Sequence, residues 1–297
     1  MGQPLLDFDN AASPLDLAMD VDCEFQLDTE MPVKLCNLPP LSAIASRVLA
    51  LSADPDVDFN TLAAAIEGDP AFAADILVIA NSSLFGLPSR VHVLRNAISV
   101  LGLDQLNALA VTVAMRGFTR KGGAAIHQCW RHSAASAAIA SAIAPVFNIS
   151  SEAAFTMSLL HDVGRLGLLK AFPSEYPRIL SSTFETPDDV LRAERAAFHV
   201  DHTHAGAWLV KSWAFPLTFA RACQHHHDAP ADGDSQLLQL VKLSCRLADA
   251  LDFGTLRYAS APDYDAIIGI LPREIRDGLP VATDLQESVE VRLSSFF

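Results

Sequence analysis

An adjacent histidine and aspartate, His161 and Asp162, stand in the middle of a mostly apolar stretch at residues 155–169. In a buried helix such a pair is costly unless hydrogen bonds or a metal ion compensate its polar groups. Neutral imidazole and carboxylate are both good ligands for divalent metals. Short motifs often match by chance, so the pair alone is a weak signal. It raises the hypothesis of a buried metal site, which other residues must support.

Histidines are concentrated in the same part of the chain, since every one except His92 lies between His127 and His227. Taken singly, each has an ordinary explanation. His132 could pack or cap a helix. The run at residues 225–227 could be a solvated helix end, where the helix dipole favours imidazolium. A helical bundle with purely structural histidines therefore remains an alternative.

Taken together, these residues supply enough imidazole and carboxylate for two metal ions. The set comprises single histidines on several predicted helices, the His-Asp pair, an adjacent His-His pair and Asp249 late in an apolar helix. Such ligands suit iron, manganese, zinc or magnesium. Two neighbouring ions can bridge a phosphate oxygen and activate water for attack at phosphorus.

Composition limits the classes of protein to which the chain can belong. Its 297 residues are 51% hydrophobic, enough for one large or two small domains. No apolar run reaches the roughly 20 residues that a membrane span needs, and the N-terminus lacks signal-peptide features. The five cysteines show no CxxC spacing, which is typical of reduced thiols, so we expect a cytoplasmic protein that does not bind membranes.

The net charge of −14 argues against non-specific binding to nucleic acid, which needs clustered lysine and arginine. It still allows a local basic pocket for a small phosphorylated ligand. The acidic charge is dense in residues 1–30, which contain eight acidic residues and no lysine or arginine. We expect this segment to be a loose acidic extension. Docking of a short part of it, residues 15–19, on the body is the alternative.

Helical periodicity with proline and glycine stops predicts an all-α protein, a two-lobed helical bundle. We expect an N-terminal helical lobe at residues 31–120, a second lobe at 121–260 and a C-terminal helical extension at 261–297, with the lobes joined near residues 116–123. Asp69-Pro70, Thr186-Pro187 and Asp201 are expected to start helices, and Gly102 to end one. The segment at 172–177 is expected to be a loop. Longer helices are predicted at 124–147, 186–199, 216–228 and 237–251, and weaker ones at 264–271 and 272–279 before a tail.

The polar residues follow one another in the order His132, His161-Asp162, His202, His226-His227 and Asp249. This order resembles that of the HD superfamily of metal-dependent phosphohydrolases. The N-terminal half extends the likeness to the HD-related output domain, called HDOD, over roughly residues 35–251. The residues that carry this resemblance are Leu38-Pro39-Pro40-Leu41, Asp69-Pro70, Ala80-Asn81-Ser82, Phe85-Gly86, Ala97-Ile98, Leu101-Gly102-Leu103, Trp130-Arg131-His132-Ser133, Leu159-Leu160-His161-Asp162-Val163-Gly164, Glu194, Asp201-His202, Gly206 and His226-His227-Asp228.

The resemblance implies an HD-like helical core with up to two divalent metals. Asp162 would bridge the ions and would be the catalytic residue if the protein is an enzyme. Arg165 would stand where HD enzymes often place a phosphate-binding lysine. The ligands implied by position are His132, His161, Asp162, His202, His226, His227 and Asp249.

The chain departs from the enzymes of this superfamily at several positions. Residues 229–233 follow the His-His pair, in place of the Gly-Tyr-Pro of the branch that hydrolyses cyclic di-GMP. Arg165 is cationic but is not equivalent to lysine at a phosphate. Gln128 occupies the position where a third metal would want glutamate, and His199 replaces a glycine common in relatives.

These observations leave two functions of different class. The first, which we expect, is a bacterial signal-transduction module of the regulatory or output type that binds a signalling protein partner and retains its metal site. The second is a metal-dependent phosphohydrolase acting on a nucleotide or cyclic dinucleotide. Ligands are present while no substrate-reading motif accompanies them, which favours the first. A nucleotide ligand is compatible with either.

Overall fold

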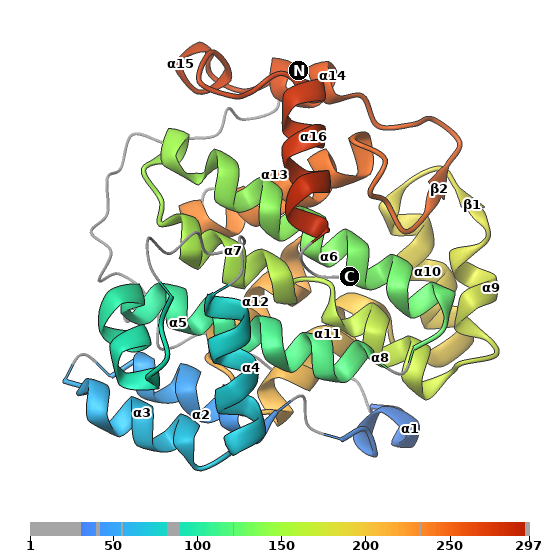
Figure 1. The fold of residues 1–297 in the computed structure, drawn as a ribbon. Helices are drawn as coiled ribbons and strands as arrows, with labels where there is room; N and C mark the ends of the chain where they lie inside the picture. The colour runs from blue at the N-terminus through green and yellow to red at the C-terminus, as the bar shows by residue number, and fades with distance from the viewer. Residues whose placement is uncertain are drawn as a thin grey trace.

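The fold is seen in a computed structural model that describes residues 31–39, 42–54, 56–81, 90–120, 122–231 and 233–294. Within these ranges the chain is helical apart from two short strands, which confirms the predicted all-α class (Figure 1). The predicted acidic extension at residues 1–30 and Phe85-Gly86 lie outside the described residues. None of the described helices is long and apolar enough to cross a membrane.

The N-terminal part is a group of helices packed around the long helix α5. The turn after α5 falls within the predicted junction at residues 116–123, although the division into lobes there stays a prediction. The helices of this group are α2 (Ala43–Ser52), α3 (Phe59–Glu67), α4 (Pro70–Ala80) and α5 (Leu94–Thr119), whereas the short helix α1 (Val33–Cys36) packs against α8 (Val163–Ala171).

Local sequence signals account for two boundaries in this group. The Asp69 carboxylate accepts hydrogen bonds from the backbone N–H groups of Ala71 and Phe72, so it caps the start of α4 as predicted. Gly102 interrupts α5 with φ 75° and ψ 176°, a backbone conformation that glycine adopts without strain. The predicted helix end at Gly102 is therefore confirmed, although the helix resumes at once.

The remaining helices form the part of the fold that carries the histidines, and they surround α6, α7 and α8. Thr186 and Asp189 form a reciprocal capping box at the start of α10, and Asp201 caps α11, both as predicted. The elements of this part are α6 (Ala124–Ile143), η2 (Ala144–Phe147), α7 (Ser151–Leu160), α8 (Val163–Ala171), α9 (Tyr176–Leu180), α10 (Pro187–Phe198), α11 (His202–Ser212), α12 (Leu217–His225), α13 (Gln236–Ala250), α14 (Tyr264–Gly269), α15 (Arg273–Arg276) and α16 (Ala282–Leu293).

The structure corrects several expectations. The His161-Asp162 pair lies in the break between α7 and α8, not inside a helix. Helix α9 begins at Tyr176, inside the segment predicted to be a loop. Residues 282–293 were expected to be part of a tail but form α16, which packs against α6. Finally, Thr183–Phe184 and Arg257–Tyr258 form a short parallel pair of strands, β1 and β2, which are too short to give a sequence pattern.

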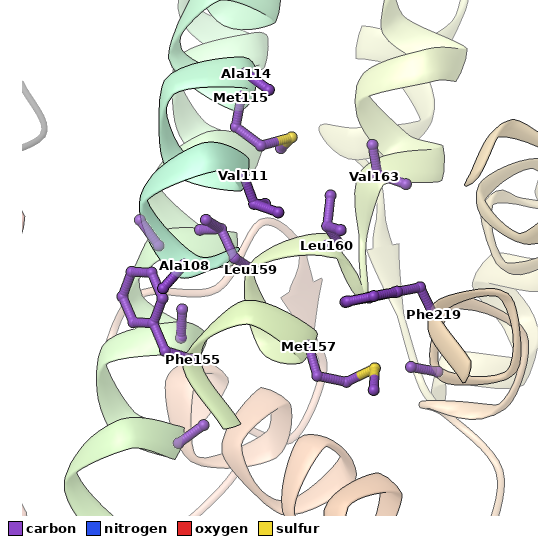
Figure 2. Close-up of a cluster of buried hydrophobic side chains, with 14 of the residues drawn as sticks. Ala108, Val111, Ala114, Met115, Phe155, Met157, Leu159, Leu160, Val163 and Phe219 are labelled. Carbon is purple, nitrogen blue, oxygen red and sulfur yellow. The ribbon is translucent and has the colours of Figure 1, made fainter. Parts of the chain in front are cut away.

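The core beside the His-Asp pair explains why the break at this point stays ordered. Leu160 and Val163, which flank the pair, are fully buried. Figure 2 shows them among apolar side chains of α5, α7 and α12, including Val111, Met157 and Phe219. Burial of these two residues fixes both ends of the break, because removing apolar surface from water stabilises the folded chain. The polar pair is thereby held in one position between two buried anchors.

Candidate metal centre

Five segments that are distant in sequence bring the candidate ligands together. His132 comes from α6, and His161 and Asp162 come from the break between α7 and α8. His202 is the first residue of α11, the pair His226-His227 directly follows α12, and Asp249 lies on α13. All are buried except His227 and Asp249, which are partly buried. The structure therefore brings these residues into one region of the fold, and their role as metal ligands stays a prediction.

Two glycines permit the close approach of α8 and α11 at this centre. A Cβ atom added to Gly164 would lie 1.8 Å from the His202 carbonyl oxygen and 2.7 Å from the Gly206 backbone nitrogen. A Cβ atom on Gly206 would in turn lie 3.1 Å from the Gly164 nitrogen. Only residues without side chains allow backbones to come this close. The glycines thus set the distance between Asp162, just before α8, and His202, at the start of α11.

The four most buried histidines share one orientation. In each ring Nδ1 meets a carbonyl or carboxylate oxygen, which can only accept a hydrogen bond, so Nδ1 carries a proton and, in the neutral ring, Nε2 keeps its lone pair. Metal-bound histidines are typically oriented in this way. The anchoring contacts are His132 to the Phe253 carbonyl (3.2 Å), His161 to the Ser158 carbonyl (2.6 Å), His202 to Glu194 Oε2 (2.6 Å) and His226 to the Cys223 carbonyl (2.8 Å).

Several of the atoms that face the centre have no hydrogen-bond partner within the described part of the chain. They are His161 Nε2, His226 Nε2 and Asp162 Oδ1, all of which are buried. Buried polar atoms are nearly always paired, and an exception calls for a missing ion or water. Neutral imidazole nitrogens and a carboxylate oxygen have the chemistry of metal ligands. The residues present therefore fit a bound divalent metal.

The candidate ligand atoms fall into two groups. We name the first triad His132, His161 and Cys245, and the second triad His202, His226 and His227; within each, the ligand atoms lie within 4.8 Å of one another. In the second triad, His202 Nε2 is 3.1 Å from His227 Nε2. Two nitrogens that share one ion at about 2.1 Å lie roughly 3.0–3.4 Å apart. The spacing of this pair is therefore compatible with a shared ion.

Asp162 lies beside the second triad. Its Oδ1 atom is 3.6 Å from His202 Nε2 and 3.9 Å from His226 Nε2. Its Oδ2 atom accepts a 2.9 Å hydrogen bond from the Nε–H of Arg165. Asp249 is placed differently, because its Oδ1 atom lies 3.6 Å from Nδ1 of His132. The Asp249 carboxylate thus contacts the anchored ring nitrogen, whereas His132 Nε2 faces Cys245.

A buried ionic network surrounds the second triad. Arg165, only 2% exposed, pairs with Asp162 and with Glu194 Oε1 at 3.4 Å, and one guanidinium nitrogen lies 3.5 Å from His227 Nε2. Glu194 also accepts a 2.6 Å hydrogen bond from the Tyr176 hydroxyl. Two carboxylates thus balance the guanidinium, as a buried charge requires.

Burial decides most protonation states at the centre. It lowers the pKa of His132 to about 3 and lowers the pKa of His161, His226 and His227, so these rings are neutral at pH 7. Burial alone would favour neutral Asp162, but the Arg165 charge and nearby histidines hold its pKa at about 2. Neutral imidazoles beside an ionised carboxylate are the states that metal binding requires.

Burial raises the pKa of Asp249 to about 7, in contrast to that of Asp162. The two carboxyl groups therefore differ in their environment, although the family resemblance implies that both are ligands. Direct contact between Asp249 and an ion stays a prediction.

The sequence reasoning missed Cys245 and Tyr176, and it named Glu194 as part of the family resemblance without giving it a role in this centre. Cys245 lies one helical turn before Asp249, a spacing that places both on the same face of α13 and could have revealed it. Glu194 and Tyr176 had no local signal, because their role depends on the positions of Arg165 and His202. The Gln128 side chain donates hydrogen bonds to the carbonyls of residues 254 and 255.

Comparison with known proteins identifies a family whose domain covers most of the chain. The profile of the HDOD domain matches residues 38–229. An uncharacterized protein of Treponema pallidum (strain Nichols) is 24% identical over 205 residues, which cover 66% of this chain and 39% of that protein. The matching part thus spans well under half the length of this curated relative.

Solved structures share the fold. An HDOD domain protein with unknown function from Geobacter sulfurreducens aligns with a TM-score of 0.67 at 22% identity, covering 88% of this chain and 93% of that one. A candidate phosphohydrolase from Shewanella amazonensis SB2B aligns with a TM-score of 0.63 at 20% identity, covering 89% of this chain and 94% of that one. A candidate signal transduction protein from Marinobacter aquaeolei VT8 aligns with a TM-score of 0.62 at 22% identity, covering 87% of this chain and 60% of that one. At these identities the likeness establishes the fold.

Proposed function

Because this chain belongs to the HDOD domain family, we propose that it is a bacterial signal-transduction module of the regulatory or output type that retains a divalent-metal site. In this proposal the metal ties together the helices that carry the ligands, and the module acts by binding a signalling protein partner. The observation that carries it is the common orientation of four buried histidines, with Nδ1 anchored and Nε2 directed to the centre.

The residues that would hold metal are the two triads together with Asp162, whereas Asp249 lies beside Nδ1 of His132, the nitrogen that does not face Cys245. A divalent ion bound there would satisfy His161 Nε2, His226 Nε2 and Asp162 Oδ1, which otherwise lack partners within the described residues. Bound metal can polarise a phosphate oxygen and lower the pKa of a water molecule. A site assembled from five segments that are distant in sequence would in addition stabilise the folded chain, because the ligands are brought together only in the native state.

The position of Arg165 supports a regulatory role over catalysis. A phosphate-binding cation must be open to substrate, whereas the Arg165 guanidinium is buried and is already paired with Asp162 and Glu194. Its positive charge, 3.5 Å from His227 Nε2, also opposes a second cation at the second triad. We therefore expect the first triad to hold its ion more tightly than the second triad does.

The competing function, a metal-dependent phosphohydrolase acting on a nucleotide or cyclic dinucleotide, is supported by a different observation. Two triads of ligand atoms are present, and Asp162 lies beside the second of them while adjoining His161 of the first. A carboxylate at this position could bridge two ions, and paired ions are the usual machinery of phosphodiester hydrolysis.

The test compares the untagged wild-type protein with Asp162→Asn. We expect wild-type protein to contain divalent metal by elemental analysis and to lose stability on chelation. Saturation to about 100 times the dissociation constant contributes about 2.7 kcal/mol, or a melting shift of roughly 5–11 °C. Asp162→Asn should bind less metal. Asp228→Asn is the matched control, because Asp228 pairs only with His225 among the contacts in the described part of the chain.

Activity separates the two functions. Metal-loaded wild-type protein should not hydrolyse a linear phosphodiester, a nucleotide or a cyclic dinucleotide, and partner proteins should co-purify equally with wild type and Asp162→Asn. Efficient turnover that Asp162→Asn abolishes would establish the phosphohydrolase instead. Absence of metal, with melting unchanged by chelators, would make the histidines structural and refute both.

A further inference from the structure

We propose that Cys245 supplies a thiolate ligand to the ion at the first triad, and that this sulfur makes the site select zinc-class ions over magnesium and manganese. The inference rests on the proposed function, since it takes a bound metal as its premise. It goes further by naming a ligand and a class of metal. In this arrangement Asp249 is not a ligand but lies beside the His132 nitrogen that faces away from the ion.

The distance between the two side chains agrees with shared coordination. Cys245 Sγ lies 3.6 Å from His132 Nε2. A tetrahedral zinc ion with bonds of about 2.3 Å to sulfur and about 2.05 Å to nitrogen places two such ligands roughly 3.6 Å apart. His161 Nε2 completes a group in which all ligand atoms lie within 4.8 Å of one another. All three side chains are buried, so the site is already desolvated.

The orientation of His132 assigns different roles to the two candidate ligands on α13. Nδ1 of His132 contacts the Phe253 carbonyl at 3.2 Å and Asp249 Oδ1 at 3.6 Å. Its other nitrogen, Nε2, is the one that meets Cys245. Since a ring nitrogen that carries a proton cannot bind metal, Asp249 contacts the nitrogen that is not a ligand. The Phe253 carbonyl accepts the hydrogen bond from Nδ1, and this bond holds the ring so that Nε2 points toward Cys245.

Sulfur at this position has a consequence for metal choice. Thiolate is a soft ligand that suits zinc and cobalt, whereas magnesium and manganese prefer carboxylate and water oxygens. On binding, the S–H bond of Cys245 breaks, a sulfur–metal bond forms and the proton passes to solvent, with no change in oxidation state. The competing interpretation of the 3.6 Å contact is a weak S–H···N hydrogen bond that involves no metal.

Cobalt substitution gives a readout that is independent of activity. We expect the cobalt-loaded wild-type protein to show a near-ultraviolet sulfur-to-metal charge-transfer band with one equivalent of metal. Cys245→Ser should lose the band and bind zinc at least tenfold more weakly, with little change in magnesium binding. Cys223→Ser is the matched control, because Cys223 is buried beside the centre but its thiol contacts the Leu160 carbonyl at 3.3 Å. Asp249→Asn should keep the band.

X-ray absorption of the zinc-loaded wild-type protein tests the proposal without any variant. We expect one sulfur neighbour at about 2.3 Å together with nitrogen or oxygen neighbours. Bound zinc with only nitrogen and oxygen neighbours, or a charge-transfer band that survives Cys245→Ser, would overturn the thiolate assignment and leave the proposed metal module intact. Failure of the wild-type protein to bind any metal would instead refute the proposed function itself.

Discussion

Substitution of Gly164 by alanine should push α8, which follows Asp162, away from α11, which carries His202 of the second triad. The added Cβ atom would lie 1.8 Å from the His202 carbonyl oxygen and 2.7 Å from the Gly206 nitrogen, and both are backbone atoms that no rotamer change can move away. Real Cβ contacts essentially never fall below 3.0 Å. The contact between α8 and α11 must therefore open by about 1.2 Å.

The size of the effect follows from this displacement. Overpacking a well-packed interior costs about 1–3 kcal/mol, and a clash with backbone places Gly164→Ala at the upper end. A loss of about 3 kcal/mol in the free energy of unfolding lowers the melting temperature by roughly 6–12 °C in a protein of this size. The shift also changes the 3.6 Å separation between Asp162 Oδ1 and His202 Nε2, so metal affinity should fall as well.

Gly117 provides a matched control on another helix. It lies within α5, and nothing is within 4 Å of its ideal Cβ position among the described residues. Gly117→Ala should stabilise the protein by up to about 1 kcal/mol, because alanine loses less backbone entropy in a helix. Thermal unfolding followed by far-ultraviolet circular dichroism measures the stability of the two variants. Elemental analysis of the folded proteins measures their metal content. If Gly164→Ala melts at or above wild type, the close approach of α8 and α11 is incorrect.

Three further changes test other parts of the centre. Tyr176→Phe removes the hydroxyl that donates to Glu194 and should cost about 1–2 kcal/mol in urea unfolding; no loss would mean that Glu194 is otherwise satisfied. His199 ends α10 with φ 61°, so His199→Gly should raise stability by about 0.5–1 kcal/mol, and a destabilised variant would contradict the left-handed geometry. Burial opposes ionisation of Asp201, but hydrogen bonds from residues 203 and 204 outweigh it and lower its pKa. Its stabilisation should be complete above the unfolded-state pKa of about 3.9 and should disappear as pH falls below it, so Asp201→Ala should flatten the acid side of a stability–pH curve.

The sequence by itself determined the helical class, most helix boundaries and the set of histidines. Helical periodicity is a local property, and a cap such as Asp69 or Thr186 acts on backbone groups within three residues. The ligand set was accessible because its order along the chain resembles that of a known family. Residues 282–293 were missed because their amphipathic pattern is weak, and their packing against α6 appears only in the tertiary structure.

Only the tertiary structure decided how those residues are used. The break that holds the buried His161-Asp162 pair depends on burial of Leu160 and Val163 against other helices, which no local pattern encodes. The same holds for the choice between Cys245 and Asp249. Both lie on one face of α13, and only the direction of the His132 ring, fixed by a carbonyl 121 residues away, places the thiol at Nε2 and the carboxylate at Nδ1. Orientation of this kind arises from contacts between segments distant in sequence, so residue type and spacing cannot determine it.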